Sequence, residues 1–189
     1  MAAGLGKRMH SALPKMLHPV AGRPLVAHAI AAARESHPAA IALVVGHGGD
    51  EVQAALAQSD LVIVRQDPPR GTGDAVRAAF RQLPHDGVTL VANGDCPLIP
   101  GSAFAALAAV AAQGKLALLT ARVPDPFGLG RVVRAADGSV RAIVEHADAT
   151  ADQKLIDEIY TGVLAAPSAL LAAWVDKLTP HNAQGEYYL

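Results

Sequence analysis

Short runs rich in β-branched residues alternate along this chain with longer, alanine-rich amphipathic stretches. The hydrophobic period therefore switches repeatedly between that of a strand and that of a helix, which is typical of successive βαβ units. We expect strands buried on both faces over residues 41–45, 61–65, 88–92 and 116–123. We expect helices over residues 24–35, 50–57, 72–82 and 102–112. Asp50 is expected to cap the second of these helices. This order predicts an α/β domain whose mainly parallel sheet has helices on both faces.

The alternation of strand-like and helix-like segments stops after residue 123, where prolines and glycines predict a long loop. Two strand-like runs then flank a turn signal at 136–138, which predicts an antiparallel hairpin. Thr150 and Gln153 have the spacing of a capping box and predict the start of a short helix. A further strand and helix are expected over residues 159–164 and 168–177.

Composition and charge limit the classes of function open to this chain. Hydrophobic residues make up 51% of its 189 residues and aromatic residues only 4%, so the core must consist mainly of Val, Leu and Ile. The formal net charge of −1 gives no long-range attraction to nucleic acid or to an anionic membrane. The longest apolar run, 103–112, is too short for a membrane helix, which needs about 20 residues. The single Cys96 excludes an internal disulfide, and we expect a cytoplasmic protein with no nucleic-acid or membrane partner.

A glycine-containing segment opens the chain. Ala2 and Ala3 lead into Gly4 and Gly6, whose neighbouring N–H groups can approach phosphate oxygens, and Arg8 follows. The spacing fits neither the dinucleotide fingerprint nor the P-loop, because a methionine stands where the fingerprint needs its third glycine. We interpret the segment as a cradle for a triphosphate, with a flexible N-terminal turn as the alternative.

Lys15 and Asp95 are candidates for phosphate and metal chemistry. Pro14 restrains the backbone before Lys15, which would direct its ammonium towards a polyanion. Asp95 follows a predicted strand, and Gly94 before it is expected to leave room for a ligand. Magnesium takes one or two carboxylates together with substrate phosphates, so Asp95 is a candidate Mg²⁺ ligand. A solvated lysine and an aspartate that caps the next turn are the alternatives.

Gln66 ends a predicted strand and precedes a loop with two prolines that opens a helix. Ligands of open α/β sheets bind beyond the carboxyl ends of the strands, so the Gln66 amide and the loop N–H groups are expected to read the edge of a base. Simple turn glycines at 71 and 73 are the alternative. In the second part of the chain, Gly130 and Glu145 would hold sugar hydroxyls, unless Glu145 is an ordinary surface residue. The eight histidines have no metal-ligand spacing.

These motifs occur in one order along the chain: A-A-G-x-G-x-R-M, L-P-K-M-L-H, Q-x-x-x-x-G-T-G-x-A, N-G-D-x-P-L, G-x-G-R, V-E-H-x-D-A and N-A-Q-G-E-Y-Y-L. The order resembles the sugar-nucleotidyltransferase family. The last two motifs resemble in particular the N-terminal domain of the bacterial bifunctional N-acetylglucosamine-1-phosphate uridylyltransferases/glucosamine-1-phosphate acetyltransferases. The resemblance spans the whole chain. It implies a Rossmann-like nucleotidyltransferase fold with a nucleotide-binding part over residues 1–123 and a smaller antiparallel, sugar-binding part over residues 124–189.

The resemblance implies Mg²⁺-dependent uridylyl transfer from UTP to N-acetylglucosamine 1-phosphate, which gives UDP-N-acetylglucosamine and pyrophosphate for cell-wall precursor synthesis. It also implies roles for individual residues. Those implied to hold the phosphates are Ala2, Ala3, Gly4, Gly6 and the catalytic pair Arg8 and Lys15. Those implied to hold uracil are Gln66, Gly71 and Thr72. Those implied to lie at the sugar nucleotide are Asn93, Gly94, Gly130, Glu145 and Tyr160, and Asp95 is implied to bind Mg²⁺. The alternatives are another sugar-1-phosphate nucleotidyltransferase and a non-catalytic nucleotide-binding fragment.

The chain departs from the pattern of this family at several points. Lys7 replaces a small hydroxyl residue, and Tyr160 stands where many relatives have a sugar-contacting Asn. The asparagine that provides the family's second magnesium ligand is not within the chain. Because the glycine loop has almost no strand before it and an apolar run ends the sequence, we expect a domain truncated at both ends. We likewise expect the acetyltransferase domain to be missing from this chain, and a homotrimer only for a full-length protein.

Overall fold

The computed structural model describes residues 1–4, 6, 9–57 and 59–189. Its strands are β1 (Pro19–Val20), β2 (Arg23–Pro24), β3 (Ile41–Val45), β4 (Leu61–Arg65), β5 (Val88–Val91), β6 (Ala117–Arg122), β7 (Arg131–Arg134), β8 (Val140–Val144) and β9 (Glu158–Pro167). Its helices are a 3₁₀ helix (Lys15–Leu17), α1 (Leu25–Arg34), α2 (Gly49–Leu56), α3 (Thr72–Phe80), α4 (Gly101–Ala111), α5 (Ala151–Lys154) and α6 (Ser168–Val175). Every strand and helix predicted from the hydrophobic pattern is therefore confirmed. The pattern does not predict the 3₁₀ helix or the β1–β2 pair.

The N-terminal side of the sheet is parallel. β3 and β4 pair in parallel along their whole lengths. Ala2 forms a parallel bridge with Val45, and its N–H donates to the carbonyl of Val44 at 2.7 Å. The N–H of Gly94, just beyond β5, donates to the carbonyl of Met1 at 2.8 Å. Residues 1–2 therefore lie between β3 and the end of β5.

β9 is the strand that departs from the expected mainly parallel sheet. It lies between β5 and β6 and pairs antiparallel with both, and it also meets β7, which forms a hairpin with β8. β5 and β6 consequently run in the same direction without being neighbours. The predicted α/β class and mixed sheet are confirmed. Parallel pairing among the described residues is confined to β3, β4 and Ala2, because the reversed strand β9 takes the place between β5 and β6.

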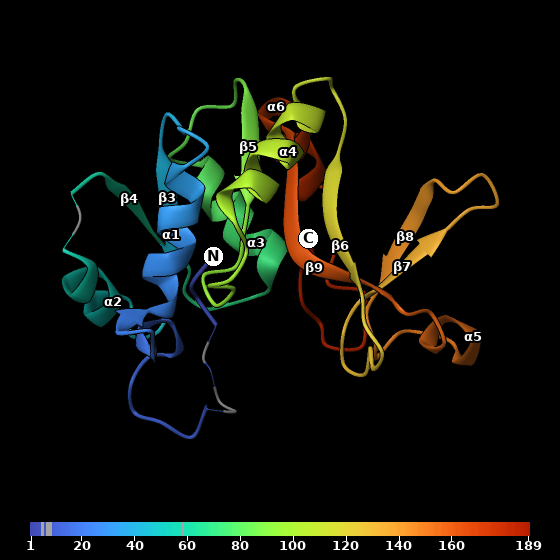
Figure 1. The fold of residues 1–189 in the computed structure, drawn as a ribbon, viewed down its shortest axis with the longest axis horizontal. Coiled ribbons are helices and arrows are strands. Elements are labelled where there is room, and N and C mark those ends of the chain that lie inside the picture. Colours follow the sequence, from blue (N-terminus) through green and yellow to red (C-terminus); the bar gives the residue numbers. More distant parts are fainter. Residues whose placement is uncertain (5, 7–8, 58) are drawn as a thin grey trace.

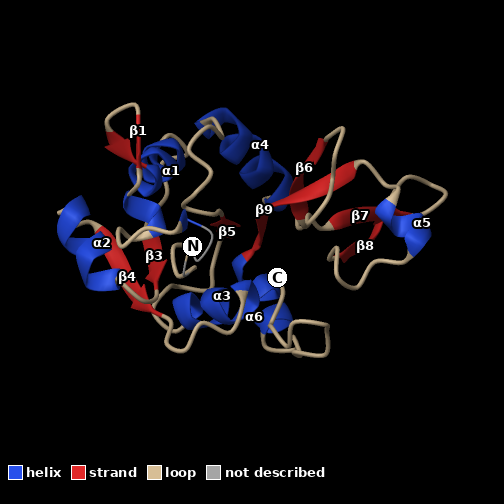
Figure 2. Ribbon diagram, turned by 90° about the horizontal axis from the view of Figure 1, so that it is seen from below, coloured by secondary structure: helices blue, strands red, loops and turns tan. Residues whose placement is uncertain are grey.

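Helices cover both faces of the sheet, as predicted (Figures 1 and 2). α1 and α4 lie on one face, and α3 and α6 lie on the other. Successive strand residues point to opposite faces, so Val45 packs with Val26 of α1 while Val44 packs with Ala75 of α3. The strands predicted to be buried on both faces are only partly so. β3 is buried over its last three residues, and β4 is paired with β3 alone within the described chain and ends in the exposed Arg65.

Residues 124–157 form a smaller part that we call the hairpin lobe, which projects beside β9 (Figure 1). Its two strands, β7 and β8, are antiparallel and flank the predicted turn at 136–138. The predicted capping box of α5 is confirmed. The Thr150 hydroxyl accepts from the N–H of Gln153 at 3.2 Å, and the Gln153 side chain accepts from the N–H of Thr150 at 2.9 Å.

The predicted capping role of Asp50 is wrong. The residue before α2 is Gly48, in the left-handed region with φ of 74°, and no side chain caps this helix. Asp50 instead lies in the first turn, where its charge favours the helix dipole and pairs with Arg65 at the end of β4. Two glycines before the aspartate allow the chain to enter the helix one residue earlier than predicted. No helix of the described residues is long and apolar enough to span a membrane.

Candidate active site

Lys15 and Asp95 meet although 80 residues separate them in the sequence. The Lys15 ammonium donates a hydrogen bond to Oδ2 of Asp95, and the two side chains are 29% and 26% exposed. A Cβ at Gly6, where φ is +59°, would lie 2.8 Å from Cβ of Lys15. The glycine segment therefore passes directly beside the lysine. Gly6, Lys15 and Asp95 therefore lie together, while their roles towards phosphate and metal stay predictions.

The rest of the predicted phosphate cradle is only partly described. Ala2 and Ala3 are buried, and the N–H of Ala2 is bonded within the sheet, so it is not available to a phosphate. Gly4 is exposed, and apart from its chain neighbours no described residue has an atom within 4 Å of the place where a Cβ would stand. The predicted catalytic residue Arg8 and its neighbour Lys7 lie outside the described residues.

The expectation that Gly94 leaves room for a ligand is wrong. Gly94 is buried, and a Cβ there would lie 3.2 Å from the carbonyl oxygen of Met1, 3.2 Å from Sδ of Met16 and 3.3 Å from Val26. Its N–H is bonded to the Met1 carbonyl. The glycine therefore allows the N-terminal residues to pack against the end of β5, which places Asp95 beyond the strand.

The donor set around Asp95 fits a magnesium ion better than a structural metal. Across the described ranges, no group of three or more His, Cys, Asp or Glu side chains could hold a metal ion. Magnesium needs only one or two carboxylates when substrate phosphates and water complete its shell. The Asp95 carboxylate already holds one cation, the Lys15 ammonium, and so provides the charge that such a site requires.

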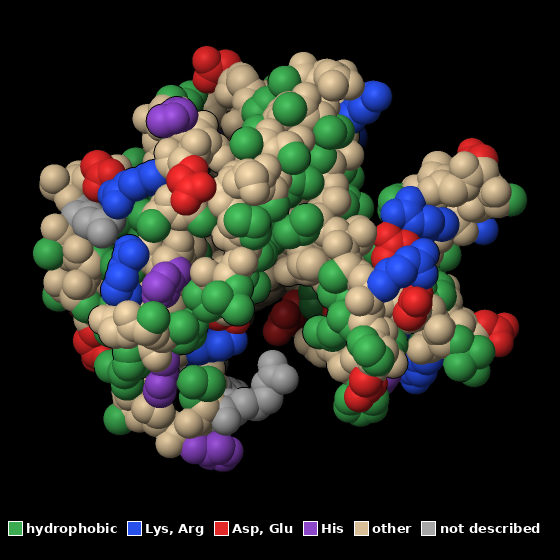
Figure 3. All heavy atoms as spheres, viewed as in Figure 1, with side chains coloured by type: hydrophobic (Ala, Val, Ile, Leu, Met, Phe, Trp, Pro, Cys, Tyr) green, Lys and Arg blue, Asp and Glu red, His purple; other side chains and the backbone are tan. Residues whose placement is uncertain are grey.

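Several other predicted residues line one cavity, which we call the Tyr160 cavity. The surface is hollowed between the sheet and the hairpin lobe (Figure 3). The lining of the Tyr160 cavity is Met1, Thr72, Asn93, Gly128, Leu129, Gly130, Glu145, Tyr160, Thr161, Gly162, Tyr188 and Leu189. Five residues implied by the family resemblance are among them: Thr72, Asn93, Gly130, Glu145 and Tyr160. The cavity is thus lined by residues from α3, from the loop after β5, from the hairpin lobe and from β9.

A β-bulge in β9 shapes this cavity. The pairing of β9 with β6 skips Thr161 and Gly162, which lie between the paired residues Tyr160 and Val163. Gly162 has φ of +79°, and a Cβ there would lie 2.3 Å from Nδ2 of Asn93. Glycine at this position therefore permits both the bulge and the close approach of Asn93.

Gly130 and Glu145 form the side of the cavity that belongs to the hairpin lobe. The carbonyl of Gly130 accepts from the N–H of Tyr160 at 2.9 Å, and a Cβ at Gly130 would lie 3.0 Å from Oε1 of Glu145. Burial raises the pKa of Glu145, and the charges of Asp148 and Glu186 raise it further. A half-buried carboxylate beside a bare glycine is well placed to accept hydrogen bonds from the hydroxyls of a ligand.

Arg131, which follows Gly130, is a residue that the sequence did not single out. Its side chain is among the largest of the fully buried ones, at 1% exposure. Its guanidinium donates to the carbonyls of Leu129 and Lys154 and lies 3.3 Å from Nδ1 of His146. It therefore joins the cavity loop to the end of β8 and to α5. The motif G-x-G-R contains this residue, but a buried arginine is too rare to expect from a motif.

Two tyrosine hydroxyls at the cavity lack partners. The Oη atoms of Tyr160 and Tyr188 are buried and make no hydrogen bond to any described residue. Burial raises the pKa of both phenols, and the charge of Glu145 adds to the effect, so both are neutral donors at pH 7. A buried, unpaired hydroxyl costs about 1–3 kcal/mol and calls for a water or ligand partner. The sequence does not predict Tyr188 at the site, because its motif, N-A-Q-G-E-Y-Y-L, points only to the family.

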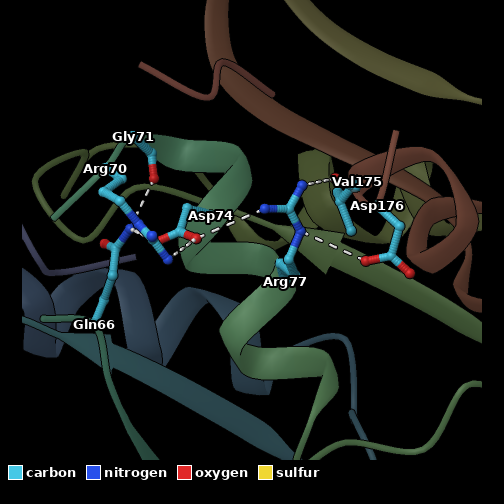
Figure 4. Close-up of polar contacts among 7 residues, drawn as sticks. All are labelled: Gln66, Arg70, Gly71, Asp74, Arg77, Val175 and Asp176. Carbon is cyan, nitrogen blue, oxygen red and sulfur yellow. Dashed lines mark hydrogen bonds and ion pairs between the residues drawn. The ribbon is translucent and has the colours of Figure 1, made fainter. Parts of the chain in front are cut away.

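Gln66 lies in a separate polar hollow, the Gln66 hollow, which is lined by Arg65, Gln66, Asp67, Arg70, Asp74, Ala78 and Arg81. Gln66 is 4% exposed. Its Nε2 donates to the carbonyl of Gly71 and to Oδ2 of Asp74, each at 3.0 Å (Figure 4). The expectation that the whole amide is free to read a base is therefore wrong. Only Oε1 remains, and it accepts no hydrogen bond from the described residues.

The last residues of the chain pack against the start of α3. A Cβ at Gly71, where φ is +108°, would lie 2.6 Å from the carbonyl oxygen of Tyr187, which accepts from the N–H of Gly73 at 2.7 Å. The N–H of Leu189 donates to the hydroxyl of Thr72 at 3.0 Å. Gly71 therefore makes room for the chain itself, and residues 187–189 pack against the end of the loop that follows Gln66.

Over residues 1–161 the chain matches the family described as MobA-like NTP transferase domain. The chain belongs to this family. The recognition of a nucleotidyltransferase made from the motifs is thereby confirmed.

Curated relatives of this NTP transferase domain include bacterial proteins named "Bifunctional protein GlmU". Identity is 49% with that of Paracidovorax citrulli, 50% with that of Burkholderia multivorans and 49% with that of Chromobacterium violaceum. Each comparison covers 100% of this chain and 41% or 42% of the relative. The chain therefore spans about two fifths of the length of these proteins.

Solved structures confirm the predicted fold of the NTP transferase domain. The structure titled UDP-glucose pyrophosphorylase complexed with UDP-glucose matches with a TM-score of 0.80, covering 99% of this chain and 81% of that one. The apo form of a UDP-glucose pyrophosphorylase also gives a TM-score of 0.80. Sequence identities of 16% and 15% limit these two comparisons to the fold.

Proposed function

We propose that this chain is a uridylyltransferase domain that joins UTP and N-acetylglucosamine 1-phosphate to give UDP-N-acetylglucosamine and pyrophosphate. The observation that carries the proposal is the Tyr160 cavity, where Asn93, Gly130, Glu145 and Tyr160 come together from three separate parts of the chain. The similarity to the bifunctional GlmU proteins supports the same reaction. We expect it to take place in the cytoplasm and to supply cell-wall precursors.

The nucleotide would lie across the carboxyl edge of the sheet. Oε1 of Gln66 would face the uracil, and the phosphates would lie towards Gly4, Gly6 and Lys15. In this arrangement the ammonium of Lys15, which the structure has on Asp95, would also serve the triphosphate. Arg8 stays a proposed second cation on the strength of the motif.

The sugar phosphate would occupy the Tyr160 cavity. Glu145 would accept hydrogen bonds from sugar hydroxyls, and the unpartnered hydroxyls of Tyr160 and Tyr188 would donate to oxygens of the sugar or of its acetamido group. Tyr160 lines the cavity, and its phenol would serve where many relatives carry an asparagine amide.

The reaction needs positioning and charge neutralisation more than a protein nucleophile. An oxygen of the sugar phosphate attacks the α-phosphorus of UTP, the bond to the β-phosphate oxygen breaks, and pyrophosphate leaves. Because the attacking oxygen is already anionic, no general base is required. Lys15 would offset the charge that builds on the leaving group. Asp95 would hold the Mg²⁺, which when bound supplies further charge neutralisation at the phosphates.

Pyrophosphate release tests the proposal. The chain is supplied with UTP, Mg²⁺ and N-acetylglucosamine 1-phosphate, and the same assay is run with glucose 1-phosphate, with galactose 1-phosphate and without acceptor. Release that requires N-acetylglucosamine 1-phosphate supports the proposal. Faster release with another sugar would indicate a different sugar-1-phosphate transferase. Binding of UTP with no release from any acceptor would indicate a nucleotide-binding fragment.

A further inference from the structure

Asp74 lies in the first turn of α3 and is buried, which is unusual for a carboxylate. It is 6% exposed, and its carboxylate is surrounded by donors. Oδ2 accepts from Nε2 of Gln66 at 3.0 Å and from Nε of Arg70 at 3.4 Å, and Oδ1 accepts from Nη2 of Arg70 at 3.1 Å (Figure 4). The guanidinium of Arg77 lies 3.8 Å from Oδ1. A buried carboxylate is thus compensated on both oxygens.

Arg77, one of the two arginines beside Asp74, is itself held by further contacts. Arg77 donates to the carbonyl of Val175 in α6 and lies 3.5 Å from Oδ1 of Asp176. Its guanidinium also stacks over the ring of Tyr187, 5.0 Å from the centroid. The position of Asp74 is therefore set from α3, from α6 and from the last residues of the chain, and its side chain has little freedom to turn.

This carboxylate determines which way round the Gln66 amide stands. A side-chain amide has a donor half and an acceptor half of nearly equal shape, and only its partners decide between the two orientations. The partners of Gln66 are the carbonyl of Gly71 and the carboxylate of Asp74, and both can only accept. The NH₂ group must face them, and Oε1 must point away from Asp74, as Figure 4 shows.

We propose that Asp74 is a positioning residue for base selection: it holds the Gln66 amide so that an acceptor, and not a donor, meets the nucleotide. The proposal rests on the proposed function, in which Gln66 faces the base. Uracil carries an N–H donor at N3, which Oε1 can accept. Cytosine has an acceptor at N3, which would face the Oε1 lone pairs without a proton between them. An unpaired contact of this kind costs about 1–3 kcal/mol, or roughly tenfold to a hundredfold in affinity.

Asp74→Asn tests this directly, because it keeps the shape of the side chain. The asparagine has a single acceptor oxygen, and the two arginines compete for it. Its NH₂ group then faces Nε2 of Gln66, donor against donor, which favours the reversed Gln66 amide. The Gly71 carbonyl still favours the original orientation. We therefore expect the preference for UTP over CTP to fall about tenfold rather than to invert.

The measurement is the ratio of the Kd for CTP to the Kd for UTP by calorimetry, together with the same ratio from kcat/KM for pyrophosphate release. Asp176→Asn is the matched control, since Asp176 contacts Arg77 and has no contact with Gln66; its ratio should equal that of the wild type. Arg70→Leu removes the side chain that donates to both oxygens of Asp74, which lets the carboxylate turn away from Gln66. It should lower the ratio by about threefold, less than Asp74→Asn, and it provides a second variant if Asp74→Asn does not fold.

Three outcomes separate the hypotheses. A wild-type preference for UTP that falls in Asp74→Asn and Arg70→Leu but not in Asp176→Asn supports the inference. A wild-type preference for UTP that stays unchanged in both variants, with equal losses for UTP and CTP, overturns the inference and leaves the proposed function intact. Equal binding of UTP and CTP by the wild type, or no binding of either, overturns the proposed function and the inference with it.

Discussion

The Gln66 hollow and the Tyr160 cavity differ in how their polar groups are satisfied. In the Gln66 hollow, the NH₂ group of Gln66 and both oxygens of Asp74 have partners within the protein. In the Tyr160 cavity, the buried hydroxyls of Tyr160 and Tyr188 find no partner among the described residues. The first region presents one acceptor in a fixed orientation, which suits discrimination between ligands. The second has unpaired hydroxyls whose hydrogen bonds would form with a bound ligand, which suits a contribution to affinity.

Arg131→Met should break the Tyr160 cavity and leave the Gln66 hollow intact. The variant removes the donor from the carbonyls of Leu129 and Lys154, so we expect the free energy of unfolding to fall by about 2 kcal/mol. Urea denaturation measures this loss. Arg122→Met is the control, because Arg122 is 69% exposed in its salt bridge and should contribute less than about 1 kcal/mol. Equal losses in the two variants would show that Arg131 does not hold the cavity loop.

Lys15→Ala tests the proposed phosphate site, where UTP from the Gln66 hollow would react with the sugar phosphate from the Tyr160 cavity. A charge-assisted hydrogen bond to phosphate contributes about 1.5–3 kcal/mol, so turnover should fall at least about tenfold. Steady-state pyrophosphate release measures the change, and the exposed Lys115→Ala serves as the control. Near-normal turnover of Lys15→Ala would remove Lys15 from the site.

Acid should weaken the side of the molecule that carries the hairpin lobe through Glu158 and Arg134. Hydrogen bonds from Arg134, at 2.8 and 2.6 Å, hold the pKa of Glu158 at about 2 instead of 4.5. Because the pKa is lower in the folded protein, the stabilisation is complete above pH 4.5 and is lost as the pH falls towards about 2. Over this window the wild type should lose about 2 kcal/mol more than Arg134→Gln, with allowance for the exposure of Arg134. Parallel stability curves by urea denaturation would contradict this assignment.

Gly162→Ala and Gly138→Ala separate backbone strain from the shape of the Tyr160 cavity. The two glycines have φ of +79° and +83°, so each substitution should cost about 1–2 kcal/mol of stability. Only at Gly162 does the new Cβ meet another side chain, that of Asn93. We therefore expect weaker binding of UDP-N-acetylglucosamine, measured by calorimetry, for Gly162→Ala alone. Equal affinities would mean that the bulge does not shape the ligand site.

Tyr160→Phe gives the smallest expected effect and the sharpest contrast between the two regions. Removing an unpartnered buried hydroxyl should leave the free energy of unfolding unchanged or raise it by up to about 1 kcal/mol. Affinity for the sugar nucleotide should nevertheless fall about fivefold, since the phenol donor is lost. Thermal unfolding and calorimetry measure the two effects, with Tyr187→Phe as the control. A less stable variant with unchanged affinity would assign the hydroxyl to structure.

Much of the fold could be predicted from the sequence because the signals are local. β-branched runs and alanine-rich stretches of different period predict every strand and helix except β1, β2 and the 3₁₀ helix to within a few residues. The capping box at Thr150 was visible for the same reason. The place of β9 was not visible, since an antiparallel strand and a parallel strand can have the same composition.

The candidate site likewise has features that the sequence predicts and features that only the packing reveals. The glycine segment, Lys15 and Asp95 could be predicted because strand ends of an α/β sheet meet at one edge. The bulge at Gly162 and the burial of Arg131 could not, because both depend on what packs against them from residues distant in the sequence.

The sequence by itself determined the order of the elements, the residue types that can meet phosphate and metal, and the family to which the chain belongs. Only the tertiary structure decided which of those groups are still free. The donors of Gln66 are already bonded to Asp74 and to the Gly71 carbonyl. Gly71 and Gly94 make room for the chain itself, and the hydroxyls of Tyr160 and Tyr188 have no partner within the described part of the chain. The physical reason is that composition counts hydrogen-bonding groups, whereas packing determines which of them are already paired.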